Sequence, residues 1–413
     1  MRRFVDLDRI KTDILDLAAI GRNERDGGLY RMAFTDADIE AKRWLLHRIE
    51  ENNLLPASDG AANISGILRG ATDDRRVFIG SHIDTVPCAG TLDGTLGVVV
   101  GLECLRVIEA AGIRPEKTVE LIAFSDEEGR FGGMFGSEAF CGFINPEKLE
   151  TAKDLAGVPL TEAMLRQGLD PIKALDARRD PASIECYLEL HIEQGPVLDR
   201  ELLQVGLVEQ ITGLQTWSLR LLGESNHAGT TPMEYRRDAL MGLADFAHEI
   251  PRILAENGVA TSRATIGKVR IQPGAANTVP GQVEFSLDFR DPDPDVLQQL
   301  SEAFQKALGA ICRRRRLQFE YQVLGDIRPV ACSPDLVDRL EQQARALKLR
   351  HRRMLSGAAH DAQQVGQVAP MAMIFVPSKN GQSHSPAEWT SWDDIEAGAN
   401  LMLNTLLDIT TAP

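Results

Sequence analysis

The stretch that decides the fold is residues 77–86, which read Val77-Phe78-Ile79-Gly80-Ser81-His82-Ile83-Asp84-Thr85-Val86. Its first three residues are a short apolar run, which is typical of a strand buried inside a parallel sheet. The polar residues that follow should then lie at the carboxyl end of that strand. Since ligands of open α/β sheets bind at this edge, the stretch predicts a parallel sheet with a functional site where the strand ends.

Similar apolar runs and helical patterns flank this stretch. Apolar runs at residues 119–124, 187–192 and 371–376 predict further buried strands. Apolar residues at helical spacing predict helices over residues 36–52, 97–111 and 334–348, and another that opens the chain around Ile10, Ile14 and Leu17. The alternation of strands and helices indicates an α/β fold with helices on both faces of the sheet.

Residues 213–327 follow a different order, which predicts a second, inserted domain. We expect a strand over 217–222, a helix over 237–257, strands over 264–271 and 283–290, a helix over 294–313 and a strand over 317–324. This βαββαβ order is that of a ferredoxin-like domain. The expected architecture is therefore a discontinuous α/β domain, residues 1–212 and 328–413, interrupted by a ferredoxin-like domain at residues 213–327.

The composition excludes several classes of protein. The formal net charge of −15 disfavours nucleic acid as a partner. No apolar run approaches the ~18 residues of a membrane span, and Asp6 and Asp8 interrupt any start that would resemble a signal peptide. The six cysteines include no C-x-x-C pair. These features predict a cytoplasmic protein with reduced thiols and no membrane partner.

One basic run, Arg313 to Arg316, stands out against this acidic background. It ends a predicted helix, where cations complement the helix dipole and stay solvated. We therefore interpret it as an exposed helix end. It indicates no nucleic-acid patch.

Side chains that suit metal ions follow four of the predicted strands. They are His82, Asp93, Glu128, His191 and His384. Each histidine taken alone is more often structural, but three imidazoles and two carboxylates at one sheet edge can serve two divalent cations if Asp93 bridges them. Zinc, manganese, cobalt and nickel all suit such ligands, and a pair of cations lowers the pKa of water to about 7.

Two further carboxylates accompany these ligands. Asp84 lies two residues after His82 on an extended segment, so we expect its carboxylate to hydrogen-bond the far nitrogen of His82 and fix its tautomer. A surface His–Asp pair is the alternative. Glu127, next to Glu128 in a Ser-Asp-Glu-Glu-Gly turn, stays spare and can act as a general base; a solvated acidic turn is the alternative.

These segments together resemble a known family, the amidase branch of the dinuclear zinc aminoacylase and carboxypeptidase superfamily. That branch contains N-carbamoyl-L-amino acid hydrolases, allantoate amidohydrolases and β-ureidopropionases. The resemblance runs from residue 80 to residue 388, in the segments GSHIDTV, GTLDG, EEG, LHIEQGPVL, SNHAGTTPM, NTVPG, DFR, SGAAHDA and NGQSHSPAE. The family usually has Gly where this chain has Ala359, which could narrow the local pocket.

The resemblance implies a role for each residue. One cation would be held by His82, Asp93 and His191, and the other by Asp93, Glu128 and His384. Glu127 would be the general acid and base. The inserted domain would be a lid and dimerisation domain of a homodimer, and its His227 would polarise the scissile carbonyl across the interface. The substrate carboxylate would be bound by Asn277 and Arg290, and Gln194 and His360 would line the same cavity.

The resemblance also implies the reaction, hydrolysis of the C–N bond of an N-carbamoyl-L-amino acid to the amino acid, ammonia and carbon dioxide. Allantoate and β-ureidopropionate are alternative substrates. In allantoate enzymes we expect Gly-Gln within the segment that here reads Thr212-Gly213-Leu214-Gln215, so Leu214 favours the carbamoyl substrate. A non-catalytic binding protein on the same scaffold is a more remote alternative, since all five ligands and Glu127 are present.

Overall fold

The structure, a computed structural model, describes residues 2–411. The chain divides into two compact units. Unit 1 comprises Met1–Glu209 and Ala331–Pro413, and unit 2 comprises Gln210–Val330. The chain thus leaves unit 1, forms all of unit 2, and returns to complete unit 1.

Unit 1 is built on a nine-stranded sheet in the order β1-β2-β4-β3-β5-β14-β6-β12, with β13 paired to β6. The strands are β1 (Leu55–Ser58), β2 (Ile64–Leu68), β3 (Thr72–His82), β4 (Lys117–Phe124), β5 (Ile184–Ile192), β6 (Val205–Ile211), β12 (Val330–Ala331), β13 (His351–Ser356) and β14 (Met371–Val376). The four central strands, β4, β3, β5 and β14, are parallel neighbours. Their carboxyl ends therefore share one edge of the sheet.

The sequence-based prediction of an α/β fold is confirmed. The four strands predicted for this domain lie within β3, β4, β5 and β14. Strand β14 is buried along its whole length, as an apolar run predicts. The flanking strands β1, β2, β6, β12 and β13 were not expected, because apolar runs this short carry no decisive periodicity. The flanking pairs β1–β2, β2–β4 and β14–β6 are antiparallel, so the sheet is mixed.

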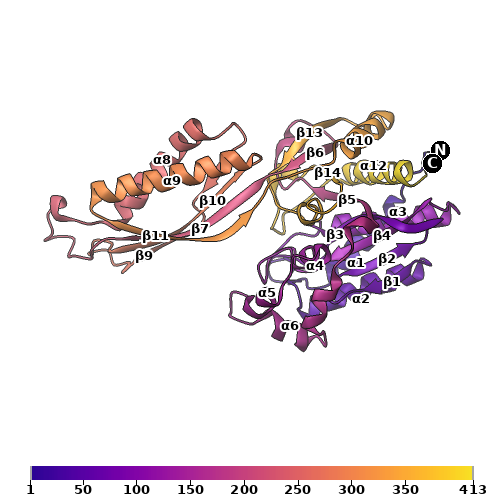
Figure 1. Ribbon diagram of the computed structural model, residues 1–413, viewed down its shortest axis with the longest axis horizontal. Coiled ribbons are helices and arrows are strands. Elements are labelled where there is room, and N and C mark those ends of the chain that lie inside the picture. Colours follow the sequence, from indigo (N-terminus) through magenta and orange to yellow (C-terminus); the bar gives the residue numbers. More distant parts are fainter. Residues whose placement is uncertain (1, 412–413) are drawn as a thin grey trace. The chain divides into compact units, whose positions relative to one another are not determined.

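Helices cover both faces of this sheet (Figure 1). One face carries α1 (Leu7–Ala19), α2 (Asp36–Glu51), α3 (Thr95–Ala110), α10 (Pro334–Ala346) and α12 (Trp392–Thr411), which share one hydrophobic core with it. The other face packs against α4 (Phe135–Cys141) and α11 (Asp361–Val365). Short elements fill the connections: α5 (Pro146–Thr151), α6 (Leu160–Arg166), η1 (Pro171–Ala177), η2 (Pro181–Ser183), α7 (Val197–Arg200) and η4 (Lys379–Gly381).

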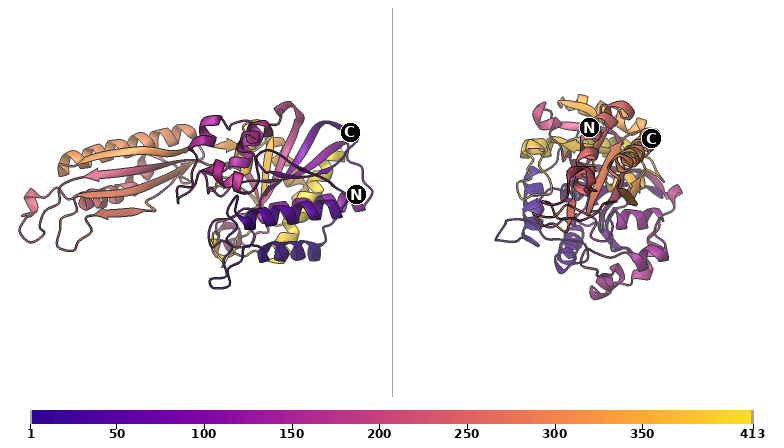
Figure 2. Two further views of the ribbon diagram at one scale, coloured as in Figure 1. Left: turned by 90° about the horizontal axis from the view of Figure 1, so that it is seen from below. Right: turned by 90° about the vertical axis from the view of Figure 1, so that its left-hand side faces the viewer.

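Unit 2 is a five-stranded antiparallel sheet with two helices packed on it (Figure 2). It contains β7 (Gly213–Leu222), η3 (Met233–Tyr235), α8 (Ala239–Asn257), β8 (Arg263–Thr265), β9 (Val269–Gln272), β10 (Gln282–Asp291), α9 (Pro294–Arg315) and β11 (Gln318–Ile327). The predicted strand over 264–271 is two strands, β8 and β9. Both strands pair with β10, Thr265 opposite Asp288 and Val269 opposite Phe285. Residues 265–269 therefore lie opposite the shorter segment 285–288, and the β8–β9 side has one extra residue. This bulge lies between Thr265 and Val269 and breaks the ladder.

All six cysteines are free thiols, and five of them are buried. Across residues 2–411, none of the helices combines the length and the apolar character needed to cross a lipid bilayer.

Candidate metal and catalytic site

His82 is the last residue of β3 and points into a buried cluster at the carboxyl edge of the sheet. Its Nδ1 lies 3.0 Å from the backbone oxygen of Asp84. A carbonyl oxygen only accepts, so Nδ1 carries the proton and Nε2 presents its lone pair to the cluster. His191, near the end of β5, follows the same rule, since its Nδ1 lies 2.9 Å from the backbone oxygen of Ile192. Both imidazoles are thus set to ligate through Nε2.

Asp93 is the centre of this cluster. Its carboxylate lies 3.1 Å from His191 Nε2, 3.2 Å from His384 Nε2 and 3.8 Å from His82 Nε2. Glu388 stabilises the loop that carries Asp93, because its Oε1 accepts a hydrogen bond from the backbone N–H of Asp93 at 3.1 Å. One carboxylate surrounded by three imidazoles is the arrangement expected of a bridging ligand.

Gly94 makes the close approach of Asp93 to His82 possible. It has a positive φ of 61°, and a Cβ at this position would lie 2.3 Å from the His82 imidazole. Any side chain would therefore displace His82. The short distance to His82 and the left-handed backbone together explain why the last residue of the GTLDG segment, Gly94, is a glycine.

The adjacent glutamates lie beside the same cluster but in different positions. Glu128 Oε2 is 3.4 Å from His384 Nε2, and Glu127 Oε2 is 3.6 Å from His82 Nε2. Both side chains are largely buried, and Oε1 of Glu128 has no hydrogen-bond partner. A buried carboxylate oxygen without a donor is costly, so this atom fits a cation as its partner.

Asp84 acts differently from the sequence-based expectation. Its carboxylate is 3.9 Å from His82 Nδ1, too far for a hydrogen bond, and the backbone oxygen of Asp84 makes that contact instead. The carboxylate accepts the backbone N–H groups of Glu127 at 3.3 Å and Glu128 at 3.2 Å. Asp84 therefore connects the His82 segment to the turn that carries both glutamates.

Two sets of possible ligand atoms, each within 4.8 Å of one another, match the predicted pair of cation sites. They are His82, Asp93 and His191 in one set and Asp93, Glu128 and His384 in the other. A third set, Glu189, His191 and His360, meets the same limit. It fits less well, because the Glu189 carboxylate already accepts hydrogen bonds from Ser81, Tyr187 and Ala362.

The electrostatics of the cluster follow from burial and from the mutual proximity of these groups. Burial raises the pKa of Glu127 and of Glu128 well above the ordinary value, and neighbouring carboxylates add to both shifts. Burial lowers the pKa of His82 to about 4. Burial alone would also lower the pKa of His191, but its hydrogen bond to Asp93 raises the value to about 9. Asp93, beside these imidazoles, has its pKa held well below the usual range despite its burial.

Gln194 and His360 were both expected to line the cavity. Gln194 lies at the cluster, where its Nε2 donates to Asp93 Oδ2 at 2.7 Å. His360 is only 1 % exposed, and its ring packs against that of His191 with centroids 4.5 Å apart. It lies beside His191 and is buried; that it lines a substrate cavity stays a prediction. Ala359, where a Gly is usual in the family it resembles, is not among the residues with positive φ, so the methyl group causes no backbone strain.

The remaining predicted residues, His227, Asn277 and Arg290, all belong to unit 2. His227 and Asn277 are exposed and lie on adjacent segments, since Ala228 N–H donates to the backbone oxygen of Asn277 at 2.8 Å. Arg290 forms an ion pair with Asp288 on the same strand, with Nε 2.8 Å from Oδ1. Its guanidinium would have to share or exchange this partner to bind a substrate carboxylate.

Sequence analysis did not single out Arg31. This side chain is completely buried. Its guanidinium donates to the backbone oxygens of Leu17 and Ile83, each at 2.6 Å, and to Thr95 Oγ1 at 2.9 Å. Ile83 follows His82 and Thr95 lies two residues after Asp93, so Arg31 connects the two segments that carry His82 and Asp93. A lone arginine in a loop gives no periodic signal that could have revealed this.

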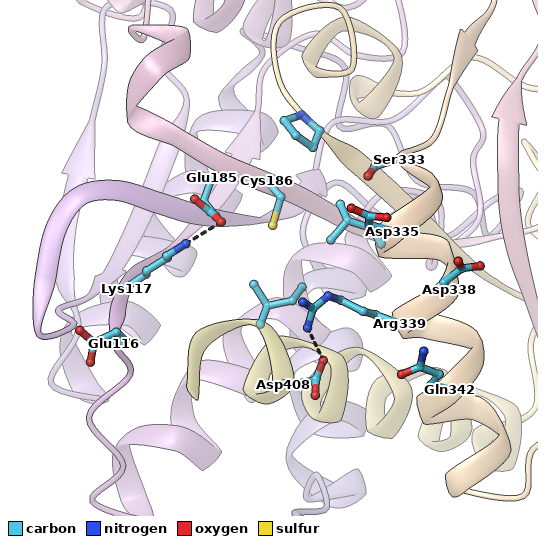
Figure 3. Close-up of a pocket in the computed structure, with 13 residues that line it drawn as sticks. Glu116, Lys117, Glu185, Cys186, Ser333, Asp335, Asp338, Arg339, Gln342 and Asp408 are labelled. Atoms are coloured by element: carbon cyan, nitrogen blue, oxygen red, sulfur yellow. Dashed lines mark hydrogen bonds and ion pairs between the residues drawn. The ribbon is translucent and has the colours of Figure 1, made fainter. Parts of the chain in front are cut away.

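The largest cavity described, of about 810 Å³, lies elsewhere, among residues that begin β4 and β5 and among helices α10 and α12 (Figure 3). It contains none of the predicted site residues. Two ion pairs lie there, Lys117 with Glu185 and Arg339 with Asp408, and Cys186 lies between them (Figure 3). Three further acidic residues, Glu116, Asp335 and Asp338, also line this cavity. Size alone therefore does not mark the candidate site in this chain.

Comparison with known proteins places this geometry in context. The model of Peptidase family M20/M25/M40 matches residues 78–408. An N-carbamoyl-L-amino acid amidohydrolase of Geobacillus stearothermophilus is 36% identical over 97% of this chain and 97% of its own length. The allantoate amidohydrolase of Escherichia coli (strain K12) is 35% identical, with 91% of this chain and 92% of the relative aligned. Among solved structures, an amidase of the hydantoinase/carbamoylase family from Burkholderia multivorans superposes with a TM-score of 0.91 at 33% identity, covering 99% of each chain.

Proposed function

Because this chain belongs to Peptidase family M20/M25/M40, we propose that it is a metal-dependent amidohydrolase that cleaves the C–N bond of an N-carbamoyl-L-amino acid. The observation that carries the proposal is the convergence of His82, His191 and His384 on Asp93, with Glu127 alongside. Family membership gives the class of chemistry, and the relatives at 34% to 36% identity supply the substrate class.

The residues present fit two divalent cations, zinc or alternatively manganese, cobalt or nickel. One would be held by His82, Asp93 and His191, and the other by Asp93, Glu128 and His384. When bound, such a pair polarises a carbonyl and lowers the pKa of water. The protonated Nδ1 atoms of His82 and His191, together with the unpartnered Glu128 Oε1, support this assignment.

Glu127 is the proposed proton carrier. It takes a proton from the attacking water and passes it to the leaving nitrogen, so that one C–N bond breaks and a carbamic acid is left. The carbamic acid then loses carbon dioxide, which breaks the second C–N bond and completes the products: the amino acid, ammonia and carbon dioxide. Asn277 and Arg290 bind the substrate carboxylate, and bidentate pairing suits the Arg290 guanidinium once Asp288 is displaced. Gln194 holds the bridging carboxylate of Asp93 in place.

His227 is proposed to stabilise the developing oxyanion from the other subunit of a homodimer. Co-expression of a His227→Ala chain with a Glu127→Gln chain tests this. In a mixed dimer, one active site combines the Glu127 of one chain with the His227 of the other. Activity that each variant lacks as a homodimer should therefore return. Mixed dimers that stay as inactive as their parents would overturn action across the interface.

The substrate is tested by ammonia release from metal-loaded protein. N-carbamoyl-L-amino acids, allantoate and β-ureidopropionate are compared at equal concentration, and the highest kcat/KM is expected for a carbamoyl amino acid. A higher value for allantoate would move the assignment toward the Escherichia coli relative. Metal-replete protein inactive on all three would overturn the proposed function.

A further inference from the structure

A small basic cavity lies in unit 2, between the start of α8 and the end of α9. It encloses about 330 Å³, and four arginines line it together with Asp238 and two methionines: Arg236, Arg314, Arg315 and Arg316, with Met233 and Met241. The sequence pattern predicted only a solvated helix end for the run that begins at Arg313. The structure instead gathers three members of that run around one cavity and adds Arg236 from a distant segment.

The positive charge of this cavity is only partly compensated. Asp245 is shared by two guanidiniums, with Oδ2 2.7 Å from Arg314 Nη2 and 2.5 Å from Arg315 Nε. Arg236 and Arg316 donate only to backbone oxygens: Arg236 to those of Ala228 and Thr231, and Arg316 to that of Glu234. Among residues 2–411, Arg314 and Arg315 thus share one carboxylate, that of Asp245, whereas neither Arg236 nor Arg316 forms an ion pair.

We propose that this cavity binds a small inorganic dianion of the phosphate type. Each guanidinium has five N–H donors, and each of the four retains at least one without a partner. Planar guanidinium groups pair with phosphate oxygens in bidentate fashion, and the two guanidiniums without an ion pair, those of Arg236 and Arg316, suit the two charges of a dianion. The cavity volume is at the lower end of the range for small-ligand sites, which suits a compact ion.

Arg236 connects this cavity to a segment of the proposed active site. Its Nε and Nη2 donate to the backbone oxygens of Thr231 and Ala228, at 3.0 and 2.6 Å, on either side of the turn that follows His227. A dianion in the cavity therefore binds a side chain that already holds this turn. The binding proposal itself does not depend on the proposed function, since all of its contacts lie within unit 2.

The direct test is chemical modification of arginines in the metal-loaded protein. Phenylglyoxal is applied in sodium chloride, sodium phosphate and sodium sulfate at equal ionic strength, and each arginine is followed by mass spectrometry. We expect Arg314 and Arg316 to react about five-fold more slowly in phosphate and sulfate, as mass action predicts for a mostly occupied site. Arg313 is the internal control, because it belongs to the same run but does not line the cavity. Equal protection of Arg313, or protection of none, would overturn the proposal.

Calorimetric titration with phosphate separates a built site from general attraction. Arg316→Gln should weaken phosphate binding about ten-fold by removing one charge-assisted partner, while Arg313→Gln, with the same loss of charge, should change it less than about two-fold. Asp93→Asn, which impairs the candidate cation site in unit 1, should leave this binding intact. Equal losses in the Arg313 and Arg316 variants, or loss in Asp93→Asn, would refute a dianion site in this cavity.

Discussion

The two ends of the parallel strands in unit 1 differ in the partners and in the burial of their acidic side chains. At the amino end, Glu185 pairs with Lys117 and Asp408 pairs with Arg339 (Figure 3). At the carboxyl end, Asp93 and Glu128 form ion pairs only with histidines within residues 2–411. Burying an anion without a counter-charge is expensive. The ion pairs of the amino end are partly exposed to solvent, whereas the carboxyl end buries its carboxylates without a Lys or Arg partner among residues 2–411 and is arranged for cations from solution. Burial of carboxylates without such a partner, and not cavity size, distinguishes the two ends.

The largest difference between the two ends should appear in turnover. Glu127→Gln should lower kcat about 10²–10⁴-fold, because proton transfer by a positioned carboxylate contributes that much. Glu185→Gln, the matched change at the amino end, should leave kcat unchanged. Ammonia release and metal content are measured on both variants. A metal-replete Glu127→Gln enzyme with near-normal turnover would remove Glu127 from the mechanism and weaken the contrast.

Cation binding should stabilise the protein through the carboxyl end alone. Zinc added to chelator-treated protein at a hundred times Kd should raise the free energy of unfolding by about 2.7 kcal/mol for each site that it fills, as linkage requires. Asp93→Asn should reduce this gain sharply, since it removes a charge common to both sets of ligands. Glu185→Gln should retain it. Thermal unfolding with and without zinc gives the comparison, and an unchanged gain in Asp93→Asn would contradict a bridging role.

Two buried arginines allow a finer comparison. Arg31 ties the His82 and Asp93 segments together, whereas Arg106 pairs with Asp13 at 2.5 Å in the same layer of helices, away from the ligands. Arg31→Lys should weaken zinc affinity about 10–100-fold, the usual cost of disturbing residues behind a metal ligand. Arg106→Lys should destabilise the fold without changing zinc affinity. Competition with a chromophoric chelator measures the zinc affinity of both variants. Equal zinc affinity in the two variants would show that Arg31 supports the fold only and does not position the metal ligands.

The smallest effect is expected at the amino end itself. Arg339→Gln breaks the pair with Asp408, whose members are partly exposed. Such pairs contribute about 0–1 kcal/mol, so the midpoint of urea unfolding should shift only slightly. Zinc affinity and turnover should not change. A loss of activity in this variant would show that the two ends are coupled.

The sequence predicted the candidate site better than it predicted how the site is supported. His82, Asp93, Glu128, His191 and His384 could be found because each follows a recognisable strand or lies in a Gly-rich turn. Their surroundings could not, since these depend on the paths of loops. Whether the carboxylate or the backbone oxygen of Asp84 contacts His82 is decided by one turn of the chain, and the burial of His360 by packing against His191.

The fold shows the same limit. The long apolar runs placed the central strands of unit 1, but the split of one predicted strand into β8 and β9 depends on a single extra residue between Thr265 and Val269. Arg31 is a further case, because an isolated basic residue in a loop has no pattern. Its role becomes visible only when its three partners, Leu17, Ile83 and Thr95, are brought together.

The central claim, that the carboxyl end of the sheet binds two cations, is tested most directly by anomalous diffraction from crystals of zinc-loaded protein. Two peaks per chain are expected, one among His82, Asp93 and His191 and one among Asp93, Glu128 and His384. A peak at Glu189, His191 and His360, a peak only at the amino end, or no ordered zinc would contradict it.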